Sequence, residues 1–487
     1  MNNGTTKVRI ISKEGRKVVK VKHIGTAHNE EELKTLMFLA QDSLEDPRQG
    51  KFKIFEPGKY LQTKIMHKKS YSKLLFYTLG KVYDKLELSK ILDKTFRELV
   101  ITRIIEPTSK LDSIRVLKEL GLKSPSNTTI HRCLKRIVTL SYSKKVAGIF
   151  IKYAKLNKAA LLLYDVTTLY FEIEKEDEYR KRGLSKERRL EPQIIVGLLV
   201  NEKGFPLAIS SFEGNQAETK TIIPVLKEFK RNCGIKNITV VSDAAMLSAE
   251  NLDILEEDGF KFIVGSRLAK TPYAIKEYRK AKESEKLPDG QIFDTTKEFI
   301  NKITRKIAIR RVIYQYKQQR AKLDLLNIHK QIKKAQMQLS DNSMIKKSRF
   351  LKIVRSHKEI NQKLIKEAKL KAGIKGYVTN LDLDEEEIIK AYHNLFQVEK
   401  SFRMAKSDLK ARPIFHQTRH SIEAHLTICF TALAISRYIQ DRTNTSIKKF
   451  VQRLKPLRTV VISIGSKEYT AEPEIDQEIQ RLLDLLN

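Results

Sequence analysis

The chain has 487 residues, with 94 Lys and Arg against 58 Asp and Glu, giving a formal net charge of +36. A hydrophobic fraction of 41% supports packed cores and excludes a disordered basic tail, and the length allows about three domains. The charge favours a polyanion such as DNA or RNA as the partner. An anionic membrane surface is the competing partner, but the sequence shows neither a basic amphipathic helix nor a lipidation signal.

The cysteines and the apolar stretches indicate a protein of a reducing compartment. Cys133, Cys233 and Cys429 are far apart and form no CxxC pair, so we expect reduced thiols rather than a zinc site or a disulfide framework. The N-terminus lacks the apolar core of a signal peptide, and the stretch 426–439 is too short and polar to cross a bilayer. We therefore expect a cytoplasmic, nucleoid-associated protein.

Residues 1–70 are expected to form a small α+β DNA-binding module. Apolar and basic residues alternate over 5–26, where Gly15 can turn a hairpin, and a helix is predicted over 30–45.

Residues 71–154 are expected to be a helical domain, with helices predicted over 79–99, 109–120 and 128–140. The last of these helices exposes basic side chains and resembles the reading helix of a helix-turn-helix. A plain three-helix bundle is the alternative. The residues predicted to contact DNA from this helix are Arg132, Lys135 and Arg136.

Residues 155–270 alternate predicted strands with one long predicted helix, over 218–233. Three strands precede this helix, whereas an ordinary βαβ protein places a helix after its first strand. The order therefore predicts the first part of an RNase H-like α/β core with a mixed sheet. The predicted strands are 161–165, 194–200, 206–211, 238–242 and 260–264.

Residues 271–376 are expected to be a basic insertion domain, with a strand over 307–316 and helix over 318–371. Only Glu359 and Glu367 oppose the basic residues of its second half, which favours a contact with the DNA backbone over a solvated helix face. Those basic residues are Lys346, Lys347, Arg349, Lys352, Arg355, Lys358, Lys363, Lys366, Lys369, Lys371 and Lys375.

Residues 377–445 are expected to complete the core and 446–487 to form a C-terminal tail. One helix is predicted from a capping box at Asp384 through to Lys406, and a second over 421–440 packs behind it.

Three acidic residues are placed as the ligands of a divalent metal would be. Asp165 and Asp243 each end an apolar run, and Glu399 lies on the predicted helix. Tyr392 and Lys406 are each seven residues from Glu399, so the three share a helix face, and Arg403 flanks it. Carboxylate oxygens suit Mg²⁺ or Mn²⁺. The alternative is a surface ion pair between Glu399 and Arg403.

Other catalytic arrangements have less support. The histidines His416, His420 and His425 cluster, but no HExxH motif surrounds them, so contact with DNA or with the wall of a site is favoured over zinc. Neither a Gly-rich phosphate loop nor a nucleophilic Cys/His or Ser/His arrangement is found.

Several ordered motifs resemble those of insertion-sequence DDE transposases of the IS-four superfamily. The likeness covers about residues 75–440. The motifs are DVTTLYFE (165–172), GLSK (183–186), PQIIVGLLV (192–200), GFPL (204–207), FEGN (212–215), VVSDAAM (240–246), VEKSFR (398–403) and RPIFH (412–416).

The resemblance implies a pattern Y-x2-R-x3-E-x6-K on the last helix, which Tyr392, Glu399 and Lys406 match. Leu395 stands where the family has arginine, and Arg403 is expected to supply the charge. It further implies two Mg²⁺ or Mn²⁺ ions per site, held by Asp165, Asp243 and Glu399, with Tyr392, Arg403 and Lys406 on DNA phosphates.

The implied activity is cleavage of DNA at the terminal inverted repeats of a transposon, followed by joining of the freed 3′-OH to target DNA. The implied partners are double-stranded transposon ends and target DNA, bound by a homodimer in a synaptic complex. Two alternatives stay open: an RNase H-like nuclease or resolvase without strand transfer, and a catalytically silent DNA-binding derivative.

Overall fold

The computed structural model forms two compact units, which are described separately. The first comprises residues 1–66 with 463–468, and the second comprises 67–462 with 469–487. The residues described are 5–42, 65–156, 159–185, 189–235, 237–244, 248–340, 348–354, 357–464 and 467–487.

The first unit contains an antiparallel hairpin and a helix. Strand β1 (Thr6–Glu14) pairs with β2 (Lys17–Ala27), and Gly15 takes the positive φ of 61° that the tight turn requires. Helix α1 (Glu30–Asp42) follows. The predicted hairpin is therefore confirmed, and the predicted end of the helix at residue 45 lies outside the described residues.

Six short helices open the second unit. The single helix predicted over 79–99 is wrong, because the chain turns between α2 and α3 at Glu87 and Leu92, which both have positive φ. Leu88 and Ile91 of that turn are buried, so packing of these side chains overrides the helical pattern. The elements are α2 (Lys73–Lys85), η2 (Leu88–Ile91), α3 (Lys94–Ile105), α4 (Ser113–Glu119), α5 (Asn127–Thr139) and α6 (Tyr142–Tyr153).

A mixed sheet forms the centre of the second unit, with order β6-β5-β4-β7-β8 in its first part. The pairs β4–β5 and β5–β6 are antiparallel, whereas β7 and β8 run parallel to β4. This arrangement agrees with the predicted RNase H-like core. The elements are β4 (Ala159–Tyr170), β5 (Gln193–Asn201), β6 (Pro206–Glu213), η3 (Glu218–Lys220), α7 (Ile222–Cys233), β7 (Asn237–Ser242), α8 (Ala249–Glu257) and β8 (Lys261–Ser266).

The segment predicted as an insertion continues the same sheet, in the order β8-β13-β10-β9. The expectation of helix throughout 318–371 is wrong, because a hairpin lies at 351–360 and brings Phe350 and Ile360 into a small separate core. Lys346, Lys347 and Arg355 lie outside the described residues. The elements are α9 (Tyr273–Ala281), β9 (Ile292–Ile300), β10 (Ile307–Tyr316), α10 (Gln318–Ser340), β11 (Leu351–Val354), β12 (His357–Ile360), α11 (Gln362–Leu370) and β13 (Ile374–Thr379).

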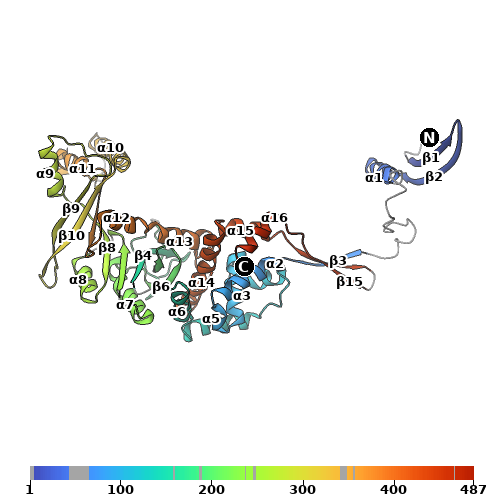
Figure 1. The fold of residues 1–487 in the computed structure, drawn as a ribbon, viewed down its shortest axis with the longest axis horizontal. Coiled ribbons are helices and arrows are strands. Elements are labelled where there is room, and N and C mark those ends of the chain that lie inside the picture. Colours follow the sequence, from blue (N-terminus) through green and yellow to red (C-terminus); the bar gives the residue numbers. More distant parts are fainter. Residues whose placement is uncertain are drawn as a thin grey trace. The chain divides into compact units, whose positions relative to one another are not determined.

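Helices α12 (Glu385–His393) and α13 (Phe396–Ser407) lie across strands β4, β5, β7 and β8 (Figure 1). The one continuous helix predicted here is wrong, because i→i−3 hydrogen bonds at residues 395, 397 and 398 tighten the chain into a bend. Buried Leu395 anchors that bend.

Helix α14 (Arg419–Thr443) is longer than the apolar stretch in the sequence indicates. It is the one candidate membrane span among the described residues, but 89% of its most apolar window is buried inside the protein, as in a core helix. The remaining elements are α15 (Ile447–Leu454), β14 (Thr459–Ile464), β15 (Lys467–Ala471) and α16 (Gln477–Asp484), with β3 (Ile65–Tyr71) joining a three-stranded sheet of order β15-β14-β3.

Candidate active site

The register of two parallel strands brings Asp165 and Asp243 together. The last pair between β4 and β7 is Tyr164 with Ser242, so the two aspartates are the next residues on adjacent strands. Adjacent strands are about 5 Å apart, which lets both carboxylates reach one point. The expectation that Asp165 ends its strand is wrong, because β4 continues to Tyr170 and pairs there with β5 alone. The neighbouring strand β7 is the one that ends.

Asp243 is exposed and oriented by two donors. Its Oδ1 accepts a hydrogen bond from the backbone N–H of Ala244 at 2.7 Å and one from the hydroxyl of Tyr392 at 3.2 Å. Burial and the negative charge of Asp243 raise the pKa of Tyr392, so this phenol stays protonated and donates. A Cβ on Gly265 would lie 2.8 Å from the Tyr392 oxygen, so the glycine permits this contact.

Glu399 lies in the first turn of α13, exposed to solvent, and shares a cationic neighbour with Asp243. That neighbour is Lys375 at the start of β13, whose Nζ is 4.3 Å from the ring centroid of Tyr392. Burial and the nearby Arg320 lower the pKa of Lys375, and the carboxylates of Asp243 and Glu399 act in the opposite direction. Lys375 therefore lies near both Asp243 and Glu399, and Asp165 lies beside Asp243 on the adjacent strand. We call these three acids the acidic edge.

The remaining residues of the predicted helix face lie beside the acidic edge. Lys406 is half-buried and lines a small cavity with Thr167, two residues beyond Asp165 on β4. Arg403 is exposed and forms no ion pair with Glu399 among the described residues, so the alternative of a surface pair is wrong in this structure. Leu395, at the position of the expected arginine, is buried in the core and cannot contact phosphate.

The three basic residues predicted to bind DNA from α5 divide into two kinds. The side chains of Arg132 and Lys135 are exposed, as a contact with DNA requires. Arg136 instead donates to the carboxylate of Asp93 at 2.7 and 3.0 Å, and that carboxylate also caps α3 by accepting from the N–H of Phe96. Helix α5 packs against α3, α6 and α14 rather than against the strands of the acidic edge.

Hard oxygen donors at the acidic edge fit Mg²⁺ or Mn²⁺ in chemical type. Within the ranges that the structure describes, no three His, Cys, Asp or Glu side chains are gathered closely enough to hold a metal ion. His416 and His425 lie with ring centroids 5.5 Å apart, whereas His420 is exposed, so the histidines form no metal cluster in the described part of the chain.

Two neighbours of the acidic edge were not recognised as site residues from the sequence. Lys375 was grouped with the basic residues of the insertion, and Arg320 was not singled out. Their position depends on β13 pairing with β8, more than 100 residues earlier in the chain. Only the pattern of a short strand with a lysine near its start, just before the helix that carries Glu399, could have pointed to Lys375.

Known proteins provide an independent comparison with this geometry. The sequence model of the family described as "Transposase DDE domain" matches residues 157–435, which is more than half of the chain. The chain therefore belongs to the family of DDE transposases. No curated protein sequence matches it.

Two solved structures show low similarity. A piggyBac transposase synaptic complex with hairpin DNA has 11% identity and a TM-score of 0.37, covering 79% of this chain and 70% of that one. A pre-cleavage Mos1 transpososome has 12% identity and a TM-score of 0.16, covering 47% and 67%. Membership of the family rests on the sequence match alone.

Proposed function

We propose that this DDE transposase is of the insertion-sequence type, of the IS-four superfamily. It binds the terminal inverted repeats of its transposon, cleaves DNA at both ends and joins each freed 3′-OH to target DNA. A homodimer holds the two ends together in this proposal. The observation that carries it is the meeting of Asp165 and Asp243 at the end of β7, with Glu399 facing the same lysine as Asp243.

The acidic edge would hold Mg²⁺ or Mn²⁺ through Asp165, Asp243 and Glu399. Two such ions supply activation of the attacking oxygen and charge stabilisation of the leaving oxygen in phosphoryl transfer. Side chains of the protein itself would orient a carboxylate and supply positive charge. Tyr392 holds the carboxylate of Asp243 in one orientation through its hydrogen bond. Lys375, together with Arg320, would place positive charge beside the acids, which favours the approach of a phosphodiester.

The direct test is incubation of the full chain with Mg²⁺, DNA carrying the inverted repeats that flank its gene, and a supercoiled target plasmid. We expect cleaved ends and a joined product in which repeat and plasmid are covalently linked. Cleavage without joined product would favour the nuclease or resolvase. Binding without cleavage would favour the silent derivative. DNA with scrambled repeats is the matched control for recognition of the ends.

A further inference from the structure

A cavity of about 670 Å³ lies apart from the acidic edge, among the helices that flank the sheet. It is lined by α3, the loop between α3 and α4, α5, the segment that follows α13, and α14. No acidic residue is among its lining residues in the described part of the chain. Four cationic side chains line it, and we call it the basic cavity: Arg103, Lys110, Lys410 and Arg412.

Two of these cations are buried without an acid to offset them. Arg103 is 6% exposed, and its side chain makes no hydrogen bond or ion pair with another described residue. Lys110 is 4% exposed, and its only hydrogen bond within the described ranges joins Nζ to Nδ1 of His425 at 3.0 Å. A buried charge without a partner is strongly unfavourable, and burial holds the pKa of Lys110 well below its ordinary value. An anion from outside would offset the charge of Arg103 and favour the charged form of Lys110.

His425 cannot supply the missing negative charge. Its Nδ1 accepts from Lys110 while its Nε2 lies 3.0 Å from the carbonyl oxygen of Ala411, which fits a neutral ring with the proton on Nε2. Burial first, and then Lys110 and Arg103, hold the pKa of His425 well below its ordinary value. The same causes lower the pKa of His416, also in the cavity wall, to about 4.

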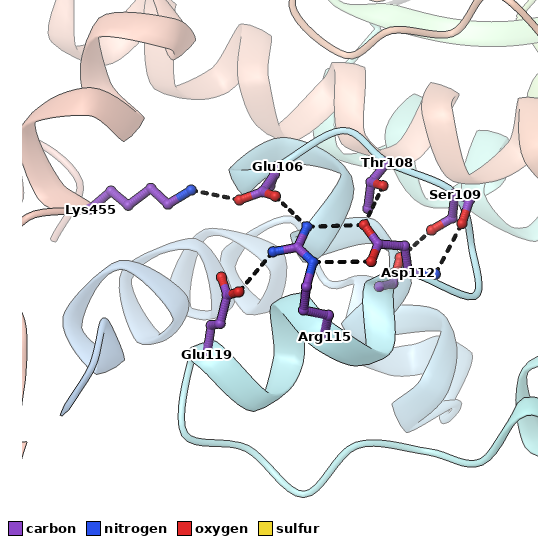
Figure 2. Close-up of polar contacts among 8 residues, drawn as sticks. Glu106, Thr108, Ser109, Asp112, Arg115, Glu119 and Lys455 are labelled. Atoms are coloured by element: carbon purple, nitrogen blue, oxygen red, sulfur yellow. Dashed lines mark hydrogen bonds and ion pairs between the residues drawn. The ribbon is translucent and has the colours of Figure 1, made fainter. Parts of the chain in front are cut away.

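The acids nearest to the cavity loop are occupied elsewhere. Glu106 and Asp112 flank the loop that carries Lys110, and both accept hydrogen bonds from Arg115 (Figure 2). Glu106 also accepts from Lys455 at 2.6 Å, and Asp112 accepts from the hydroxyl of Thr108 at 2.6 Å. This network holds the loop in place and leaves no carboxylate for Lys110.

We propose that the basic cavity binds a phosphate group of the DNA substrate. This inference rests on the proposed function. Several cations, the planar donor fork of Arg103 and hydroxyls of the wall such as Ser109 suit the several oxygens of phosphate better than a carboxylate. The volume exceeds that of a bare phosphate ion, and apolar walls from Ile130 and Pro413 leave room for the attached nucleoside.

The position of the cavity agrees with a DNA strand that also crosses the acidic edge. The guanidinium of Arg412 lies over the ring of Tyr170, at 5.4 Å from its centroid. Tyr170 ends β4, five residues beyond Asp165, a distance of about 16 Å at roughly 3.3 Å per residue. That corresponds to about five nucleotides of helical rise at 3.4 Å each.

Binding of phosphate should be accompanied by uptake of protons. A bound anion favours the charged forms of Lys110, His416 and His425, whose pKa values the empty cavity holds low. The other ionisable groups facing them are Arg103, His131, Lys410, Arg412 and Cys429. At pH 8 we expect net proton uptake, seen as a dependence of the binding enthalpy on the ionisation enthalpy of the buffer.

The decisive experiment compares Lys110→Met with Lys118→Met in the full chain. Lys118 is exposed on the next helix and is the matched control. Binding of inorganic phosphate, a deoxynucleoside 5′-monophosphate and duplex DNA is measured by calorimetry, with thermal unfolding as the test of folding. We expect Lys110→Met to fold and to weaken all three interactions at least about tenfold, with loss of proton uptake, while Lys118→Met binds like the parent.

Unchanged binding of the mononucleotide and of DNA by Lys110→Met would overturn the proposal. Loss of binding to free phosphate alone, with DNA binding and cleavage intact, would overturn the assignment to DNA. Should Lys110→Met unfold, Arg103→Gln is subjected to the same measurements and the same outcomes decide. We expect Asp243→Asn to bind phosphate in the basic cavity whether or not the chain is a transposase. Failure of the proposed transposase function is therefore distinguishable from failure of the proposed phosphate site.

Discussion

At the acidic edge the charged groups Asp243 and Glu399 are exposed to water, whereas in the basic cavity Arg103 and Lys110 are almost fully buried. Exposure lets water solvate the carboxylates, so their electrostatic cost in the empty protein is low. Arg103 has neither water nor an acid beside it, so its buried charge is costly, and burial lowers the pKa of Lys110 for the same reason. The comparison shows two ways of keeping a binding site ready: the acidic edge keeps its charges solvated by water, whereas the basic cavity keeps basic groups buried, where a bound anion would favour their charged forms.

The largest expected effect tests the acidic edge. Asp165→Asn or Asp243→Asn should reduce both cleavage and joining by at least about 10³-fold, since several kcal/mol of charge stabilisation are lost. DNA binding and thermal stability should remain near those of the parent. The measurement is a gel assay with end-labelled repeat DNA.

Glu399→Gln should behave in the same way, with Glu386→Gln as the matched control. Glu386 is an exposed acid in the first turn of α12. Normal joining by Glu399→Gln would remove this residue from the site and leave the two aspartates to act with another group.

A smaller effect is expected from the hydrogen bond that orients Asp243. Tyr392→Phe should lower the cleavage rate about tenfold, because a hydrogen bond to a charged group is lost. Gly265→Ala should match it, since the added Cβ would lie 2.8 Å from the Tyr392 oxygen and 3.1 Å from the Ala244 nitrogen. Gly148→Ala meets nothing within 4 Å and is the control. Normal rates in both site variants would show that this orientation is dispensable.

The ion pair between Arg136 and Asp93 provides a structural comparison with the basic cavity. Arg136→Ala should destabilise the fold by about 2 kcal/mol, because it leaves a buried carboxylate without its cation. Arg132→Ala, on the same helix but exposed, should change stability little and weaken DNA binding. Denaturant unfolding and DNA titration measure the two effects. A loss of DNA binding without loss of stability in Arg136→Ala would favour a direct contact of Arg136 with DNA.

The smallest effect concerns the pH dependence of stability. The folded pKa of His416 is about 4, below its unfolded value, so its neutral form is favoured in the fold. The resulting contribution of His416 to the free energy of unfolding is present above about pH 6.5 and is lost as the pH falls towards 4. His416→Asn should therefore lose less stability than the parent between pH 6.5 and 4.5, whereas His420→Asn, an exposed control, should follow the parent.

Local patterns were sufficient for much of the core and for its acids. The apolar runs before Asp165 and Asp243 marked two strands, and the strand predicted over 307–316 has those bounds in β10. The bend at Leu395 was not predictable, because it depends on how that side chain packs in the core and not on a Gly or Pro signal.

The basic cavity was equally hidden in the sequence. Its wall is assembled from five segments, and no local spacing places Lys110 beside His425, 315 residues later. The two histidines His416 and His425 were noticed as a cluster, but their partners Arg103 and Lys110 come from the helical region that precedes the core. Burial of a cation is a long-range property, so it becomes visible only once α3 and α14 are packed together.

The place of β13 between β8 and β10 has a consequence for synthesis of the chain. Ser266 of β8 pairs with Gly376 of β13, 110 residues later. A ribosome adding about 5–20 residues per second needs roughly 5–20 s to supply that strand. During this interval the edge of β8 has no partner, and open strand edges recruit other chains. Newly made copies on neighbouring ribosomes are therefore the first competitors for the position that β13 finally occupies.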